Sequence, residues 1–159
     1  MNGDLAERDD ALEHEFPELV KAGYEIKSPC DASYNCVAFA VGDTHNWWED
    51  TGEYQVNGYY WPPGINGDTV NGWVRVFELH GYTEADNEIL EDEYEKIAIY
   101  ALPDGPEHVA RQKSSGEWAS KMGRRYDIHH TLSSLEGEYM GKVVKIMKRR
   151  CRSGRRVLE

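Results

Sequence analysis

The residue best placed for chemistry is Cys36, in the segment YNCVAFAVG (34–42), where a polar stretch turns into a short apolar one. Asn35 or Ser33 can cap a helix over residues 36–41, with the cysteine at its first position. A thiol at a helix N-terminus next to an imidazolium has a lowered pKa and becomes a nucleophile at neutral pH. Free cysteines also pack as small buried hydrophobic residues, and this alternative stays open for Cys36.

A cysteine nucleophile needs a base within hydrogen-bond reach, and a histidine at the start of a strand meets that need. His108 opens the strand-like run HVARQ after the turn DGPE. A third polar group should orient the imidazole. Asp127 is the first choice and Ser120, in the neighbouring run EWASKM, is the second. Asp127 can equally cap a helix that starts near Ile128.

Elements of different character surround these residues. Helical spacing is predicted over residues 4–15, with Asp4 as a possible cap, and over residues 69–80, with Asp68 as the cap. Residues 43–68 form a long aromatic loop. Strand-like runs follow at 95–102, 108–112, 117–122 and 142–147. The two central runs should pair as a hairpin, so the order of elements predicts an α+β domain with an antiparallel sheet.

Length and charge limit the organisation further. The chain has 159 residues and a net charge of −11, which fits one folded domain over residues 1–148. The stretch 142–156 contains basic residues and no acidic one, which predicts a basic C-terminal tail over residues 149–159. The acidic N-terminus and the absence of a long apolar run predict a cytoplasmic protein, with export by a dedicated system left open.

The cysteine and histidine patterns argue against metals and cofactors. The three cysteines are Cys30, Cys36 and Cys151, and no CxxC occurs, so neither a disulfide framework nor a structural zinc site is predicted. A bridge between Cys30 and Cys36 is the alternative that would inactivate the nucleophile. Neighbouring side chains such as His129 and His130 rarely converge on one ion. We therefore expect no metal and no cofactor.

Two resemblances bear on the fold. YNCVAFA resembles the nucleophile segment of the NlpC/P60 and CHAP branches of the papain-like fold, and EHVARQ resembles their histidine strand. The span from Tyr34 to Arg149 is also similar to an uncharacterised bacterial domain family with the motifs YNCVAFAVGDTHNWW, GYYWPPG, EKIAIYA, HVARQ, GEWASKMG, DIHH and LEGEYMGKVV. The first resemblance implies a papain-like fold in which a helix bearing Cys36 packs on a small antiparallel sheet. The sequence departs from that pattern at Cys30, where a glutamine would complete the oxyanion hole.

These observations predict a cysteine-dependent amide or acyl hydrolase or transferase with a Cys36–His108 dyad. Its expected partner is a peptide, an amide-containing molecule or a protein, rather than a membrane or nucleic acid. The expected substrate contacts are Tyr34, Asn35, Trp47, Trp48, Tyr60 and Trp61. Three alternatives remain. The aromatic loop can be a flap over the core, or the contact surface of a non-catalytic binding module in a bacterial effector or defence system, and the basic tail can bind an anion or nucleic acid.

Overall fold

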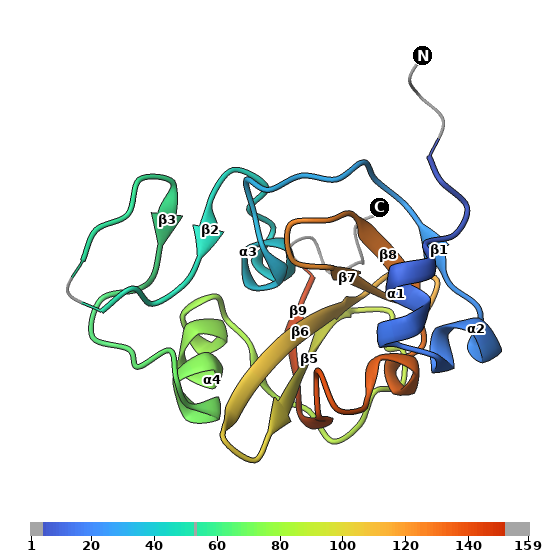
Figure 1. Ribbon diagram of the computed structural model, residues 1–159. Helices are drawn as coiled ribbons and strands as arrows, with labels where there is room; N and C mark the ends of the chain where they lie inside the picture. Colours follow the sequence, from blue (N-terminus) through green and yellow to red (C-terminus); the bar gives the residue numbers. More distant parts are fainter. Residues whose placement is uncertain (1–4, 53, 152–159) are drawn as a thin grey trace.

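The computed structural model describes residues 5–52 and 54–151, and its main element is a seven-stranded antiparallel sheet (Figure 1). The strand order is β1-β8-β7-β6-β5-β9-β4. The strands of this sheet are β1 (Glu25–Ile26), β4 (Thr83–Glu84), β5 (Tyr94–Leu102), β6 (Gly105–Gln112), β7 (Trp118–Lys121), β8 (Asp127–His130) and β9 (Lys142–Arg150). The helices are α1 (Asp10–Glu15), α2 (Glu18–Ala22), α3 (Cys36–Val41), α4 (Val70–Leu79) and the 3₁₀ helix η1 (Leu132–Leu135).

The expectation of a papain-like fold is wrong. That fold requires a helix packed on a small antiparallel sheet, whereas this chain is mainly one large sheet, and α3, the helix that begins with Cys36, has six residues. The sequence indicated four strands, which correspond to β5, β6, β7 and β9. The three additional strands are β1, β4 and β8. Two residues each form β1 and β4, and four form β8, so these strands are too short for a clear alternation of side chains.

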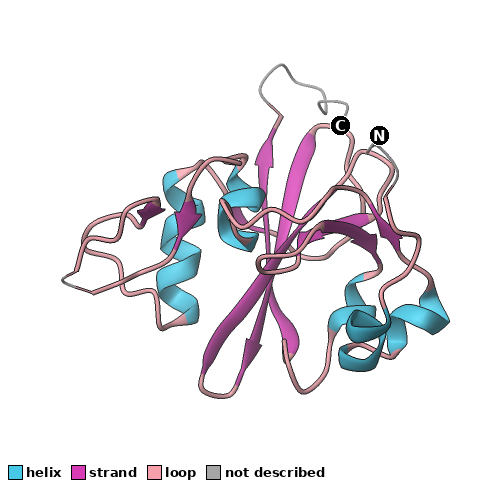
Figure 2. Cartoon of the chain, turned by 45° about the horizontal axis from the view of Figure 1, so that its top comes forward, coloured by secondary structure: helices cyan, strands magenta, loops and turns pink. Residues whose placement is uncertain are grey.

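The sheet is covered by helices on both faces (Figure 2). Side chains alternate along β5, so that Ile97 and Ile99 pack with α3 and α4, while Ala98 and Tyr100 pack with α1, α2 and η1. All four of these side chains are buried. Because β5 lies between β6 and β9 and is covered on both faces, its sequence is almost continuously apolar.

The helix that begins with Cys36 forms as predicted. The side chain of Asn35 caps α3 by accepting a hydrogen bond from the backbone N–H of Ala38. Gly42 ends the helix with φ of 90°, a left-handed conformation that favours glycine. Ser33, the other candidate cap, instead bonds to the carboxylate of Asp31.

The boundaries of the other predicted helices are partly wrong. Thr69, not Asp68, caps α4, because its hydroxyl accepts the N–H of Gly72. The first helix begins at Asp10 and is capped by Asp9. The alternative cap, Asp4, lies outside the described residues. These errors arise because neighbouring Asp, Ser and Thr residues are all competent caps in sequence.

The predicted hairpin between the two central runs is confirmed. Strands β6 and β7 pair with Arg111 opposite Ala119 and Gln112 opposite Trp118. The aromatic loop contains a short parallel pair of its own, made by β2 (Trp47–Trp48) and β3 (Tyr59–Tyr60). This pair holds the loop beside α3 and α4 (Figure 1).

The predicted basic tail begins inside the sheet, because Arg149 and Arg150 belong to β9. Basic side chains of β9 form ion pairs with acidic side chains: Lys145 with Glu84, Lys148 with Glu91, Arg149 with Glu95 and Arg150 with Glu93. Residues 152–159 lie outside the described part of the chain. Within residues 5–52 and 54–151, no helix has the length and apolar character needed to cross a membrane.

Candidate functional site

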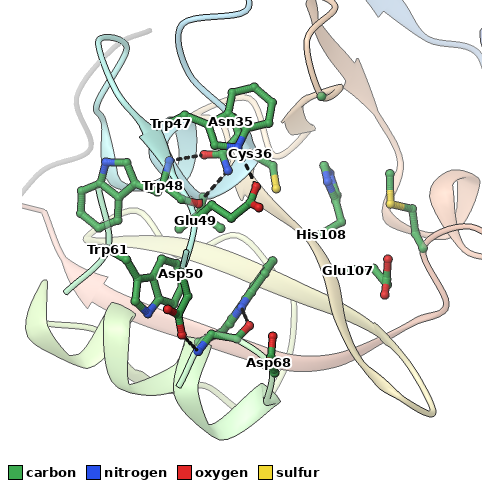
Figure 3. Close-up of a pocket in the computed structure, with 15 residues that line it drawn as sticks. Asn35, Cys36, Trp47, Trp48, Glu49, Asp50, Trp61, Asp68, Glu107 and His108 are labelled. Carbon is green, nitrogen blue, oxygen red and sulfur yellow. Dashed lines mark hydrogen bonds between the residues drawn. The ribbon is translucent and has the colours of Figure 1, made fainter. Parts of the chain in front are cut away.

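A cavity of about 410 Å³ brings Cys36 and His108 together (Figure 3). Cys36 enters it from the first position of α3, and His108 enters it from β6. The sulfur of Cys36 accepts hydrogen bonds from backbone N–H groups, including that of Val109, the residue after His108. The thiol therefore lies against the strand that carries the imidazole.

Asn35 fixes the first turn of α3 to the aromatic loop. Its side-chain oxygen accepts hydrogen bonds from the backbone N–H groups of Ala38 and Trp48, both at 3.1 Å. Its amide nitrogen donates to the carbonyl of Trp48 at 2.7 Å. Because all of these bonds are buried, the amide of Asn35 positions Cys36 and Trp48 relative to each other and has little capacity left for a substrate.

Lys121 fixes the segment that precedes the nucleophile. The side chain is fully buried, and its ammonium group donates to the carbonyls of Asp31, of Tyr34 at 2.9 Å and of Gly123 at 2.6 Å. The nitrogen also lies 4.5 Å from the centroid of the Tyr34 ring. One side chain of β7 therefore holds the chain immediately before Cys36.

A buried chain of hydrogen bonds determines the tautomer of His108. His130 Nδ1 is 2.7 Å from the carbonyl of Thr131, which can only accept, so Nδ1 carries the proton. Burial lowers the pKa of His130 to about 4, so at neutral pH its Nε2 is bare and accepts the Ser120 hydroxyl at 2.7 Å. The Ser120 oxygen in turn accepts the N–H of His108 Nε2 at 2.8 Å. His108 Nδ1 is then the unprotonated nitrogen.

The cysteine and the histidine are both uncharged at neutral pH. Burial raises the pKa of the Cys36 thiol to about 11, against the smaller effect of the hydrogen bonds from Val109, Val37 and its own N–H. Burial, and next the charge of His130, lower the pKa of His108 to about 3. The expectation that an imidazolium would lower the thiol pKa is therefore wrong in the free protein, because burial disfavours both charged forms.

The buried histidines should make the protein sensitive to acid. His108 and His130 have pKa values of about 3 and about 4 in the folded state, below the ordinary value, so the unfolded chain binds more protons. Their contribution to stability is complete above about pH 6.5 and is lost as the pH falls toward 4. We expect the free energy of unfolding, measured with urea, to fall less between pH 6.5 and pH 4 in His130→Gln than in wild type. His45→Gln, at an exposed position, is the control. Equal acid dependence in all three proteins would contradict this prediction.

The carboxylate of Asp127 has a partner other than His108. Asp127 begins β8, so the alternative that it caps a helix near Ile128 is wrong. Its carboxylate accepts the hydroxyl of Tyr34 at 3.1 Å, and burial raises its pKa. Of the two predicted orienting groups, Ser120 is the one that hydrogen-bonds to His108.

The aromatic loop supplies a large part of the cavity wall. Trp47, Trp48 and Trp61 line it, as does Trp73 from α4, which was not among the predicted contacts. Tyr60 instead packs edge-on against Trp48, with ring centroids 4.8 Å apart. The position of Trp73 could not be read from its helical spacing, because that spacing is equally typical of a core residue.

Two cysteines, Cys30 and Cys151, and one cluster of acidic groups with a histidine lie outside the cavity. None of Cys30, Cys36 and Cys151 forms a disulfide, so the alternative Cys30–Cys36 bridge is absent. Among the described residues, one group could hold a metal ion: Glu25, Glu117 and His129, with both glutamates exposed. These three side chains do not line the Cys36 cavity.

The fold and the site together define a class of antiparallel-sheet domain whose cavity combines a cysteine with a neutral histidine. The chain belongs to the family described as Domain of unknown function (DUF7689), whose model matches residues 25–148. Neither the curated proteins nor the solved structures include a significant match. The family match gives no link to NlpC/P60 or CHAP enzymes, so that resemblance stays a prediction and the function must be argued from the cavity.

Proposed function

We propose that the protein is a cysteine-dependent hydrolase or transferase of amide or acyl groups, with Cys36 as nucleophile and His108 as base. The observation that supports this proposal is the orientation of the histidine. Ser120 occupies Nε2, which leaves Nδ1 bare on a histidine that lines the same cavity as Cys36. A nitrogen with this protonation can accept the thiol proton.

The reaction has two stages, and in each of them His108 takes up one proton and then gives it back. The Cys36 sulfur attacks the acyl carbon while its proton moves to Nδ1, forming the carbon–sulfur bond. Nδ1 then returns the proton to the leaving amine or alkoxide as its bond to the acyl carbon breaks. Water in hydrolysis, or an amine or alcohol in transfer, then attacks the acyl carbon while its proton moves to Nδ1. The carbon–sulfur bond breaks, and Nδ1 returns the proton to the Cys36 sulfur. The Ser120 oxygen accepts the Nε2–H throughout, so the ring keeps its orientation.

A neutral serine as the orienting group fits the electrostatics of the dyad. A carboxylate beside Nε2 would favour an imidazolium, whereas the Ser120 hydroxyl adds no negative charge. The low pKa of His108, about 3, agrees with this arrangement. We therefore expect charge separation only during the reaction, when the substrate fills the cavity and the proton moves.

Acylation by p-nitrophenyl acetate tests the proposal. We expect the acetyl group to appear on Cys36 faster than on the exposed Cys30, because Cys36 lines the same cavity as His108 and Cys30 does not. Peptide mapping by mass spectrometry measures both sites in one sample. Cys36→Ala should lose the fast nitrophenolate release, and Cys30→Ala should retain it. Acetylation of Cys36 slower than that of the exposed Cys30 would show that no base compensates for the burial of the Cys36 thiol, and would contradict the proposal.

A binding module is the second candidate function, and the surface of the aromatic loop favours it. Tyr54 is 80% exposed, and Tyr60 and Val56 are each 44% exposed on the same loop. Exposed aromatic side chains of this kind are typical of protein contact surfaces. A binding module would retain its partner in Cys36→Ala and lose it in Tyr54→Ser, which separates it from the enzyme.

A further inference from the structure

We infer that the cavity takes a substrate with a positively charged group, an amine or a guanidinium, next to the reacting acyl group. The inference rests on the proposed function for the reacting bond and adds the chemical class of the substrate. Three properties of the lining support it: its charge, its tryptophan content and its lack of hydrogen-bond donors.

The charge of the lining is negative. Four carboxylates line the cavity and no lysine or arginine does: Glu49, Asp50, Asp68 and Glu107. None of the four forms an ion pair with another residue in the described part of the chain. The backbone N–H groups of Gly67 and Gly52 lower the pKa of Asp50, which keeps it ionised at neutral pH. Burial, and next the charge of Asp104, raise the pKa of Glu107, which a bound cation would counteract. The lining therefore holds negative charge that no ion pair in the described residues neutralises.

Tryptophan is concentrated at the same place. Four of the five tryptophans of the chain line this one cavity: Trp47, Trp48, Trp61 and Trp73. Each indole N–H is already used within the protein, by Glu49, Asp43, the carbonyl of Ile65 and the carbonyl of Gly67 respectively. The indoles therefore offer the cavity their rings rather than their donors. Tryptophan rings attract cations more strongly than other aromatic rings do.

The polar groups that remain available are mostly acceptors. The amide nitrogen of Asn35 is bonded to Trp48, and His108, which is 2% exposed, has a bare Nδ1 with no partner among the described residues. An ammonium or guanidinium group has donors and no acceptors, so it complements this lining. A saccharide is less suited, because its hydroxyls also need donors that the lining lacks.

The protein itself shows how a guanidinium packs on one of these rings. The guanidinium carbon of Arg124 lies 4.6 Å from the centroid of the Trp47 ring. Its nitrogen also donates to the hydroxyl of Tyr59 at 3.2 Å. Arg124 is exposed and does not line the cavity, so the carboxylates inside remain available to a ligand.

Matched neutral and charged probes test the inference. Cys36→Ser, which should bind without turnover, is titrated with N-acetyl-arginine amide and with the neutral N-acetyl-citrulline amide, following tryptophan fluorescence. We expect the arginine probe to bind about tenfold more tightly. The double variant Asp68→Asn/Glu107→Gln should lose most of that preference, because it removes two of the four carboxylates of the lining. Within residues 5–52 and 54–151 neither side chain forms a hydrogen bond or an ion pair, so the fold should be unchanged. Glu138→Gln, an exposed change outside the cavity, should retain it.

Two results would overturn the inference. One is equal affinity for the arginine and citrulline probes, and the other is tighter binding of an N-acetylglucosamine oligosaccharide than of the arginine probe. The acylation experiment separates this inference from the proposed function. Charge-selective binding without acylation of Cys36 would leave a cation site in a protein that is not an enzyme. Acylation without charge preference would leave the enzyme and remove the cation site.

Discussion

His108→Ala is expected to slow the acylation of Cys36 by p-nitrophenyl acetate about a thousandfold at pH 7. In the wild type, the thiol and the imidazole keep their protonation states between pH values of about 3 and about 11. The wild-type rate should therefore change little between pH 5 and about pH 9. Without the base only the thiolate reacts, so the rate of the variant should rise about tenfold for each pH unit.

Stopped-flow measurement of nitrophenolate release across this pH range distinguishes the two mechanisms. The difference between wild type and His108→Ala should shrink steadily as the pH rises, because hydroxide replaces the missing base. His129→Ala, on β8 and outside the cavity, is the control for losing a histidine. If the two pH profiles run parallel, His108 does not take the proton.

Lys121→Met should lower the free energy of unfolding by about 3 to 5 kcal/mol. The substitution retains the apolar stem and removes the ammonium group that bonds to the carbonyls of Asp31, Tyr34 and Gly123. Those carbonyls would lose a charged donor inside the protein, where water reaches them poorly. Urea unfolding at pH 7, followed by circular dichroism, gives the change.

Lys27→Met is the matched control, since Lys27 is exposed. Its effect should stay within about 0.5 kcal/mol, as is usual for surface positions. A loss in Lys121→Met as small as in this control would show that the three carbonyls find other donors. Lys121 also holds Tyr34, two residues before Cys36. We therefore expect Cys36 to be acylated more slowly in Lys121→Met than in wild type, at temperatures where the variant remains folded.

Local features of the fold could be predicted from the sequence. The α3 helix with its Asn35 cap and the β6–β7 hairpin follow from neighbouring residues, and both form. The overall fold could not be predicted, because the seven-stranded sheet depends on pairings such as β1 with β8 across about a hundred residues. The resemblance to papain-like enzymes rested on two short segments, which do not determine the number of strands.

Part of the candidate site could also be predicted, because it depends on neighbouring residues. A cysteine at a helix start and a histidine in a strand are local signals, and the structure brings Cys36 and His108 to one cavity. The predicted strand start was wrong, because β6 begins at Gly105, three residues before His108. The contributions of His130 and Lys121 were missed. His130 acts through Ser120 on the neighbouring strand, and Lys121 reaches carbonyls about ninety residues earlier in the chain. The spacing of residues along one segment contains no signal for either contact.

The position of β9 has a consequence during translation. β9 is the last strand of the sheet in sequence, yet it lies between β5 and β4 and pairs with β5 along most of its length. The ribosome synthesises the chain from its N-terminus, so the α3 helix and the aromatic loop emerge long before β9, the strand that completes the sheet. Until residue 150 has emerged, β5 presents an unpaired apolar edge. We therefore expect a chain truncated before β9 to expose this edge and to aggregate more readily than the full chain.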